Sequence, residues 1–546
     1  VDSPAFATPA LELRYPEKVI AMRRRDVLKS AAGLTILPEG VLGGKNPPSE
    51  RLNVALIGVW GRGTAFYNTL RKENVVALCD VNDRRTAETL RLFPKARTYR
   101  DWRRCLDQKD VEAVIICTAD HHHAFIANWA LNRDMHVFCE KPLGITVEEV
   151  RTVRANYLRR KAKVATQHGT QRHGYPNFER LRELILDGAI GELKRVHSWD
   201  SRRLPRPGYP PAEGEPPSFF DYEQWIGPSP YHPYSPQYFG GTSGLNCLFW
   251  NMYRDFGVGQ IGDMGAHTMD LVWNAIDAAA PTAIEVDWDV SDPYHPDVCP
   301  VKLKVAFELP GNAWRGPLTC LWYQGGLKPE PPKGYIDIAR IANGALFEGT
   351  KGAILADFTS RVIIPNNDDG DFTYYRRRSR TELLPLVGGA GQPTQSATGA
   401  RRASGPPPPP AGLAAWPSPE PGPNGFAMIQ FVEGGVPAAL GLSNTDVEAI
   451  LEAEKSGRAP ARDAFQADWI EACKGRSDNV RHGTSSKTHC DFDYAGTMME
   501  QMLLGLVAHQ AGKRLEYDPA TGRVTNLREA NDYLARRYRP GWTLNG

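Results

Sequence analysis

The chain has 546 residues, of which 41% are hydrophobic and 23% are charged, so it can bury the cores of several domains of roughly 100–200 residues each. Lys and Arg (65) almost balance Asp and Glu (63), which removes the electrostatic argument for a nucleic-acid partner. Nine cysteines without CxxC spacing argue against a disulfide scaffold and a structural zinc site, and the lack of an apolar run of about 18 residues argues against a membrane-spanning helix.

Residues 1–50 are predicted to be an N-terminal extension with a targeting signal and not part of the folded domains. Arg24 and Arg25 stand before Asp-Val-Leu-Lys, and a mildly apolar stretch follows, which is typical of a twin-arginine export signal. The alternative is the basic start of an ordinary helix. We therefore expect a periplasmic or secreted protein, or a cytoplasmic one if the segment is not a signal.

A glycine-rich turn follows the first predicted strand. A short apolar run over 53–57 predicts a buried parallel strand, and Gly58, Gly61 and Gly63 come next, where a helical pattern begins. Such glycines permit a tight turn that presents a phosphate to the N-terminus of a helix. Trp60 departs from the GxGxxG pattern, because it stands where the second glycine is expected. Its ring must point away from a dinucleotide or cover it.

The second predicted strand, over 75–79, ends in an acid that suits a ribose. Asp80 lies 22 residues after Gly58. A carboxylate at this spacing accepts hydrogen bonds from the ribose hydroxyls, and its charge repels a 2′-phosphate. The sequence therefore favours NAD over NADP, although the neighbouring Arg84 and Arg85 leave NADP open.

Further strands alternate with helical segments. They are predicted over 113–117, 136–139 and 162–167. This alternation predicts an α/β fold with a doubly wound parallel sheet of the Rossmann type, in which ligands bind at the carboxyl ends of the strands. The residues expected at those ends are Asp80, Thr118, Lys141 and Gln167.

Two stretches carry candidate catalytic side chains. Lys141 follows a strand and can donate a hydrogen bond to a substrate oxygen, although the default for a lysine in a turn is the surface. Farther on, 262–276 predicts a helix with Asp263, His267 and Asp270 on one face. His267 with a carboxylate one turn away is a candidate general base with an orienting acid. The alternative is a capped helix with a half-buried histidine.

Three consecutive histidines, His121, His122 and His123, raise the question of a metal site. Adjacent side chains point to different sides of a chain, so we do not expect them to converge on one ion. The sequence therefore predicts no metal site.

Together these motifs resemble the Gfo/Idh/MocA oxidoreductases, in particular their larger exported members. The order and spacing of the motifs are more specific than any one of them. The stretches that carry the resemblance are 58–63, 118–123, 140–142, 168–172, 188–192, 225–230, 255–257, 262–267, 346–352 and 503–542.

The resemblance implies two domains. The first, over 51–172, is an NAD(P)-binding Rossmann domain. The second, over 173–546, is an α/β domain whose large open, mostly antiparallel sheet covers the substrate cleft and often mediates oligomerisation. Its strands are predicted independently by the residue pattern over 282–288, 301–310, 318–324 and 345–356.

One segment, over about 365–461, does not match the family. Its density of proline and glycine is incompatible with a helix or an inner strand, and it includes five consecutive prolines over 406–410. We expect an extended, solvated insert, and the alternative is a polyproline segment that binds a partner.

The resemblance also implies the site residues. Lys141, Asp263 and His267 correspond to the family's catalytic residues. The cofactor-binding residues that it implies are Gly58, Trp60, Gly61, Arg62, Gly63, Asp80, Thr118, His123, Glu140, Lys141 and Gln167.

Three functions remain open at this stage. The first is an NAD-dependent dehydrogenase of a sugar, cyclitol or glycoside, in which His267 removes the hydroxyl proton, Asp263 orients it and Lys141 binds the reacting oxygen. The second is a glycosidase on the same scaffold, which oxidises the sugar transiently with a recycled NAD. The third is a sugar-binding protein without catalysis. We expect a small carbohydrate ligand, no nucleic acid and a homo-oligomer.

Overall fold

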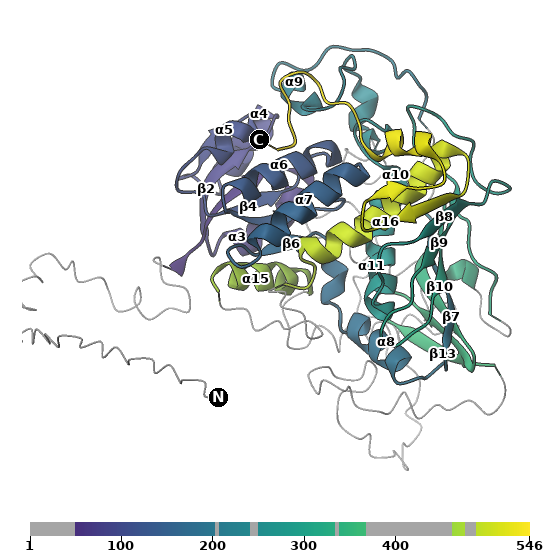
Figure 1. The fold of residues 1–546 in the computed structure, drawn as a ribbon. Coiled ribbons are helices and arrows are strands. Elements are labelled where there is room, and N and C mark those ends of the chain that lie inside the picture. Colours follow the sequence, from purple (N-terminus) through teal and green to yellow (C-terminus); the bar gives the residue numbers. More distant parts are fainter. Residues whose placement is uncertain are drawn as a thin grey trace, which may run out of the picture. The chain divides into compact units, whose positions relative to one another are not determined.

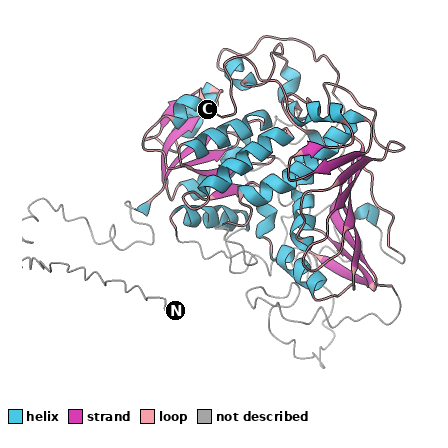
Figure 2. Ribbon diagram, viewed as in Figure 1, coloured by secondary structure: helices cyan, strands magenta, loops and turns pink. Residues whose placement is uncertain are grey.

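The computed structural model describes residues 50–202, 207–240, 249–332, 338–366, 461–475 and 488–545. The described residues from Leu52 onward form one compact unit. The predicted export signal and almost all of the Pro-rich insert over 365–461 lie outside the described residues. Figure 1 shows the order of the elements and Figure 2 their secondary structure.

The first sheet has six parallel strands in the order β3-β2-β1-β4-β5-β6. This order confirms the predicted doubly wound sheet, because the chain moves outward from β1 in both directions. Residues 161–163 form a turn, so the last strand begins later than predicted. The strands are β1 (Asn53–Ile57), β2 (Asn74–Cys79), β3 (Arg97–Tyr99), β4 (Ala113–Ile116), β5 (His136–Cys139) and β6 (Thr166–His168).

Alternate residues of its strands enter two separate cores. Val114 and Ile116 of β4 pack with α5 (Trp102–Leu106), α6 (Asp120–Asn132) and α7 (Val147–Arg160). Ala113 and Ile115 pack on the other face, with residues of α3 (Tyr67–Leu70) and α15 (Ala461–Cys473). Burial on both faces explains why these strands are continuous apolar runs.

Helix α15 returns to this sheet from far along the chain (Figure 1). Trp469 is 1% exposed, and its Nε1 donates to the carbonyl oxygen of Ala165, 304 residues away. Gln466 Oε1 accepts from Thr69 Oγ1 at 2.7 Å. A segment that the sequence places within 173–546 thus completes the core of the first sheet.

The second sheet has nine strands in the order β13-β12-β11-β7-β10-β9-β8-β14-β15. Among the described strands of this second sheet, only β7 and β10 pair in parallel. The prediction of a mostly antiparallel sheet is therefore confirmed. The strands are β7 (Leu193–Asp200), β8 (Ala283–Val286), β9 (Leu303–Leu309), β10 (Leu318–Gln324), β11 (Asn343–Gly349), β12 (Gly352–Ala356), β13 (Arg361–Pro365), β14 (Leu515–Asp518) and β15 (Arg523–Val524).

One face of this sheet is covered by three helices, α8 (Pro176–Leu186), α11 (Met264–Ile276) and α16 (Phe492–Ala511). Figure 1 shows α8 and α11 beside the strands. The remaining helices are α4 (Asp83–Leu90), α9 (Tyr222–Ile226) and α10 (Gly259–Gly262). Among the described residues, every helix is too short or too polar to cross a bilayer.

Candidate functional site

The glycine turn after β1 requires glycine at two positions for lack of space. A Cβ on Gly58, whose φ is +85°, would lie 2.4 Å from the carbonyl oxygen of Cys117, and one on Gly63 would lie 2.1 Å from that of Gly58. Gly61 differs, because its φ is +59° but the space around it is open. The turn therefore brings its backbone against the end of β4, as a dinucleotide turn does.

Trp60 points its ring away from this packed turn. The ring is 44% exposed, and the guanidinium of Arg85 lies 3.9 Å above its centroid. Arg84 stacks in the same way on Phe219, at 3.9 Å. Both arginines that left NADP open in the sequence are thus placed on aromatic rings.

Asp80 closes the turn from the end of β2. Its Oδ2 accepts from the amide of Val59 and its Oδ1 from that of Asn82, each at 2.9 Å. Burial raises the pKa of Asp80, and these backbone hydrogen bonds oppose the shift. The carboxyl group therefore sits at the strand end where a ribose is expected, held by the glycine turn itself.

Arg62 and Glu140 join the glycine turn to the end of β5. Arg62 Nε donates to Glu140 Oε1 at 2.7 Å, and Glu140 is 3% exposed. Arg62 Nη2 and Glu140 Oε2 are buried and have no partner among the described residues. Because buried polar atoms are normally hydrogen-bonded, these two atoms fit a bound group that offers both acceptors and donors. The phosphates and ribose hydroxyls of a dinucleotide offer both.

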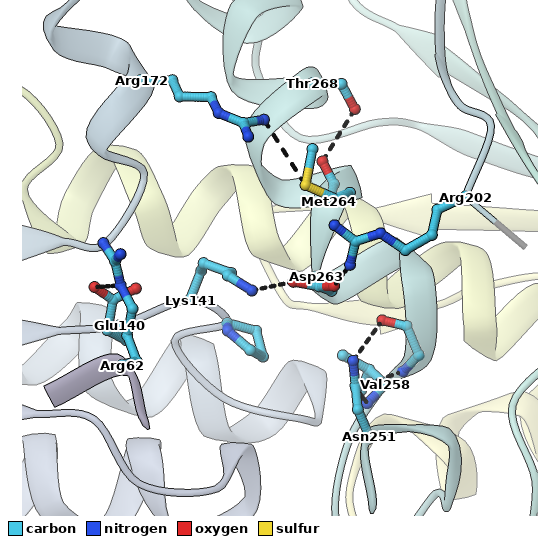
Figure 3. A network of polar contacts seen from close by, with 12 residues as sticks. Arg62, Glu140, Lys141, Arg172, Arg202, Asn251, Val258, Asp263, Met264 and Thr268 are labelled. Atoms are coloured by element: carbon cyan, nitrogen blue, oxygen red, sulfur yellow. Dashed lines mark hydrogen bonds and ion pairs between the residues drawn. The ribbon is translucent and has the colours of Figure 1, made fainter. Parts of the chain in front are cut away.

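Lys141 is linked across the site to the start of α11 (Figure 3). Its Nζ donates to Asp263 Oδ1, and Arg202 Nη1 donates to Asp263 Oδ2. Burial alone would raise the pKa of Asp263, but Lys141 and Arg202 outweigh it and lower the pKa to about 2. Asp263 is therefore ionised and holds two cations that come from different sheets.

The expected contact between Asp263 and His267 is not made. Both carboxylate oxygens of Asp263 are engaged by Lys141 and Arg202 among the described residues. Asp263 precedes α11 with φ −83° and ψ −97°, which is not a helical conformation. The rule that i and i+4 share a helix face therefore does not apply to it.

His267 is instead a neutral imidazole without a carboxylate partner. It is 4% exposed, and its Nδ1 is buried with no partner among the described residues. Burial, followed by the charges of Arg172 and Lys141, holds the pKa of His267 well below its usual range. At neutral pH its ring is therefore unprotonated, which is the form that a general base needs.

The chain matches known proteins in both halves. Residues 52–168 match the Gfo/Idh/MocA model described as an oxidoreductase family with an NAD-binding Rossmann fold, and residues 211–311 match the model of its C-terminal alpha/beta domain. These two stretches are thus similar to the two domains of the Gfo/Idh/MocA oxidoreductases.

Among curated relatives, inositol 2-dehydrogenase of Salmonella typhimurium is 35% identical over 151 residues, which are 27% of this chain and 45% of that protein. Myo-inositol 2-dehydrogenase of Thermotoga maritima is 27% identical over 155 residues, which are 27% of this chain and 46% of that protein. The chain thus spans about half the length of the curated relatives it matches.

Solved structures resemble the fold at lower identity. A levoglucosan dehydrogenase in complex with NADH and levoglucosan has 17% identity and a TM-score of 0.46, over 85% of this chain and 99% of that one. The WlbA dehydrogenase of Bordetella pertussis, in complex with NADH and UDP-GlcNAcA, has 10% identity and a TM-score of 0.49, over 85% and 97%.

Three residues predicted to bind cofactor have contacts within the protein. The ring nitrogens of His123 lie 2.6 and 3.0 Å from the carbonyl oxygens of Pro142 and Thr118, so His123 ties the loops after β4 and β5 together. Gln167 Oε1 accepts from the amide of Cys490 at 3.1 Å, so it anchors the segment before α16. The Thr118 hydroxyl donates to the next carbonyl oxygen at 3.2 Å.

The neighbouring His121 and His122 converge, contrary to expectation. Nε2 of each ring lies 2.8 Å from the same carbonyl oxygen of Trp225. The expectation that adjacent histidines diverge is therefore wrong here, because both rings lie against the last turn of α9. What the two rings share is a backbone acceptor.

Asp270 also lies apart from Lys141. Its Oδ1 accepts from His173 Nδ1 at 2.8 Å and from the hydroxyl of Tyr494. Buried ligand-type atoms of His173, Asp270 and Cys490 lie within 4.8 Å of one another. The sequence did not single out this trio, because its members are far apart in the chain. The hydrogen bonds that Asp270 accepts from His173 and Tyr494 account for its position.

Sequence reasoning missed Arg202 and Asp200 because it did not predict β7. Only Lys194 and Arg195 of this strand are exposed and 196–200 are all buried, so the stretch lacks the period-two pattern that marks a half-buried strand. Asp200 ends that strand at 1% exposure, and burial raises its pKa to about 6 against the opposing charge of Arg202. His168, at the end of β6, is also fully buried, and burial lowers its pKa to about 3.

Proposed function

We propose that this Gfo/Idh/MocA protein is an NAD-dependent oxidoreductase that acts on a ring hydroxyl of a sugar, cyclitol or glycoside. The observation that carries the proposal is that the charges of Lys141 and of Arg62, from the glycine turn, both act on the buried neutral ring of His267, while Asp263 holds Lys141. The inositol dehydrogenases among its relatives support this substrate class.

Each residue has a distinct task in this proposal. NAD, when bound, accepts the hydride that leaves the reacting carbon. The neutral ring of His267 accepts the hydroxyl proton, and the ammonium of Lys141 donates a hydrogen bond to the reacting oxygen. Asp263 holds that ammonium in place, because it bridges Lys141 and Arg202.

The surroundings of Asp80 favour NAD over NADP. A second negative group beside this carboxyl would be repelled. Arg84 and Arg85 lie over Phe219 and Trp60, and Arg85 also pairs with Glu88 at 2.8 Å. Their charges are therefore already engaged within the protein.

The deciding experiment begins with the cofactor. The purified chain is denatured, and any released nicotinamide is identified by mass and absorbance; the protein is then assayed with NAD and a panel of inositols, hexoses and aryl glycosides. We expect one NAD(H) per chain or tight titration with NADH, and NADH formation with at least one polyol. A protein that binds neither NAD nor NADP would refute the proposal.

Two variants test the catalytic assignment. Lys141→Met and His267→Gln remove the proton donor and the proton acceptor and should each lower kcat by about 10²–10⁴-fold. The Kd for NADH should stay within a few-fold, because neither side chain forms the glycine turn. Normal turnover in both variants would sink the assignment.

A glycosidase with a recycled NAD is the second candidate. It needs a further group for proton transfer, and Asp200, whose pKa lies at about 6, is a buried carboxyl beside Arg202 that can serve. Release of an aryl group without accumulation of NADH would favour this function over the dehydrogenase.

Export and self-association complete the proposal. We propose that the twin-arginine segment directs export, which is tested by fractionation of cells that carry Arg24→Lys and Arg25→Lys together. We propose also that two copies associate through the face of the second sheet opposite α11, where Leu321, Val362 and Ile364 are half-buried. Light scattering with a charged substitution at Leu321 tests this contact.

A further inference from the structure

Three polar side chains end neighbouring strands of the second sheet at the same position. Asp200 ends β7, Gln324 ends β10 and Asn343 begins β11, and Asp200 is the register partner of both others. Because register partners share a face of a sheet, the three side chains lie on one side.

That side is the one that faces α11. Trp199, one residue before Asp200, belongs to the cluster on the opposite face, with Leu346 and Leu355. Ala345 and Phe347 of β11 belong to the core that includes α11, and Asn343 shares their parity. Since successive side chains alternate between faces, Asp200 and Asn343 both point toward α11.

Arg202 connects this position to the candidate active site. Its backbone amide donates to Asp200 Oδ1 at 3.3 Å, and its guanidinium donates to Asp263, which also holds Lys141. Figure 3 shows Arg202, Asp263 and Lys141 in one chain of contacts. Asp200 is therefore separated from Lys141 by only two side chains.

The three polar side chains differ in their partners. Gln324 is satisfied, because its Nε2 donates to the carbonyl oxygen of Pro300 at 2.9 Å and its Oε1 accepts from Trp322 Nε1 at 3.0 Å. Asp200 Oδ2 and Asn343 Oδ1 are buried and have no partner among the described residues. The two side chains are 1% and 5% exposed. A buried acceptor without a donor is unfavourable, so this pair fits a ligand that supplies donors.

The charges nearby restrict what that donor can be. Lys141, Arg172 and Arg202 surround Asp263, so an ammonium group would meet three cations, whereas a hydroxyl donates a hydrogen bond without adding charge. The donors that fit are therefore hydroxyl groups.

We infer that Asp200 and Asn343 form a subsite that receives two neighbouring hydroxyls of the substrate ring, away from the carbon oxidised at Lys141. This inference rests on the proposed function and narrows the substrate to a polyhydroxylated ring with adjacent free hydroxyls. Simple alcohols and rings that are deoxygenated or substituted at those positions are then poor substrates.

The test pairs variants with single-deoxy substrates. Asp200→Ala and Asn343→Ala are assayed in the full chain with the best polyol of the panel and with its deoxy analogues. Each variant should raise KM by about 10–100-fold, the loss expected for one hydrogen bond to a charged or buried group. For one deoxy analogue the same variant should add almost nothing, because the contact is already absent.

Two further readouts separate binding from structure. Below pH 6 Asp200, facing Arg202, Asp263 and Arg172, takes up a proton, so we expect KM of the parent protein to rise there. Asp200→Asn keeps the shape and should abolish that rise. Saturation of a thermal shift by the polyol should weaken in both alanine variants, with the Kd for NADH unchanged.

The possible results are distinguishable from failure of the proposed function. Loss of NADH binding in the parent protein refutes that function itself. Normal NADH binding and turnover, with KM unchanged in both alanine variants for every polyol, overturns only the subsite and leaves the two acceptors to buried water. Equal loss with the parent polyol and all deoxy analogues also overturns it.

Discussion

Polar side chains gather at two places, the carboxyl ends of β1, β4 and β5 and the register pair of Asp200 in β7 with Asn343 in β11. The two sheets bring these side chains together in different ways. In the six-stranded sheet all strands run parallel, so residues that follow strands share one edge through topology alone. In the nine-stranded sheet β7 and β11 are antiparallel, so Asp200 at an end meets Asn343 at a beginning. Motif spacing finds the first kind of site, whereas only strand register finds the second.

The largest effect on NADH binding should come from a change in the backbone of the glycine turn, at the carboxyl edge of the parallel sheet. Gly63→Ala places a Cβ 2.1 Å from a carbonyl oxygen that cannot move without the glycine turn. We expect the Kd for NADH, measured by fluorescence titration, to rise by about 100-fold or more, or the fold to be lost by circular dichroism.

Gly61→Ala is the matched control. Its Cβ meets open space, so only the strain of the positive φ remains, about 1–2 kcal/mol. If Gly63→Ala and Gly61→Ala changed the Kd for NADH equally, the lack of space for a Cβ at Gly63 would not be what requires glycine there.

The second-largest effect should come from the loss of Asp263, which links Lys141 of the first sheet to Arg202 of the second. Asp263→Asn removes the negative charge that Lys141 and Arg202 share, and leaves two cations facing each other. We expect kcat to fall by about 10–100-fold and the free energy of unfolding in urea to fall by about 1–3 kcal/mol.

Asp134→Asn provides the comparison for this link. The pair of Asp134 with Lys163 is exposed at 45% and 67% of its side chains, so its loss should change stability by less than about 1 kcal/mol. Equal losses from the two substitutions would contradict a special role for the buried link.

Acid should lower the free energy of unfolding, because buried histidines lie near the carboxyl ends of the parallel strands. Burial lowers the pKa of His121, His122, His168 and His267, to about 3 for His122 and His168. As pH falls below about 6.5, the unfolded chain binds protons that the folded chain refuses, so stability falls by up to about 1.4 kcal/mol per pH unit for each histidine. The raised pKa of Asp200 acts in the opposite direction between about 6 and 3.8.

Urea unfolding at pH 7.5 and at pH 5.5 checks this slope. His168→Gln removes one of the four titrating groups and should flatten the dependence. Identical slopes for the parent and the variant would show that the pKa of His168 is the same in the folded and the unfolded chain.

The smallest effect should come from the exposed arginine on Trp60. Arg85→Ala removes a cation–π contact worth about 0.5–1 kcal/mol at an exposed site. The Kd for NADH should change by only a few-fold, and the preference for NADH over NADPH should remain. A loss confined to NADPH by tenfold or more would instead identify Arg85 as a ligand of the 2′-phosphate.

The sequence predicted the first sheet more fully than the second. β1, β2, β4 and β5 stand within one residue of the predicted strands, because each is a short apolar run bounded by polar or glycine residues. β7 was missed, since its apolar residues Leu193, Val196 and Trp199 stand three apart and not at alternate positions. The 345–356 stretch is a hairpin of β11 and β12 that turns at residues 350–351.

What the sequence by itself determined is the glycine turn, the parallel sheet, Lys141 at its edge and His267 on a helix, because local spacing and burial decide these features. Tertiary structure alone decided that Asp263 binds Lys141 and Arg202 rather than His267, that α15 completes the first core, and that Asp200 meets Asn343. Each of these depends on side chains distant in the chain, and their meeting follows from how the helices and sheets pack.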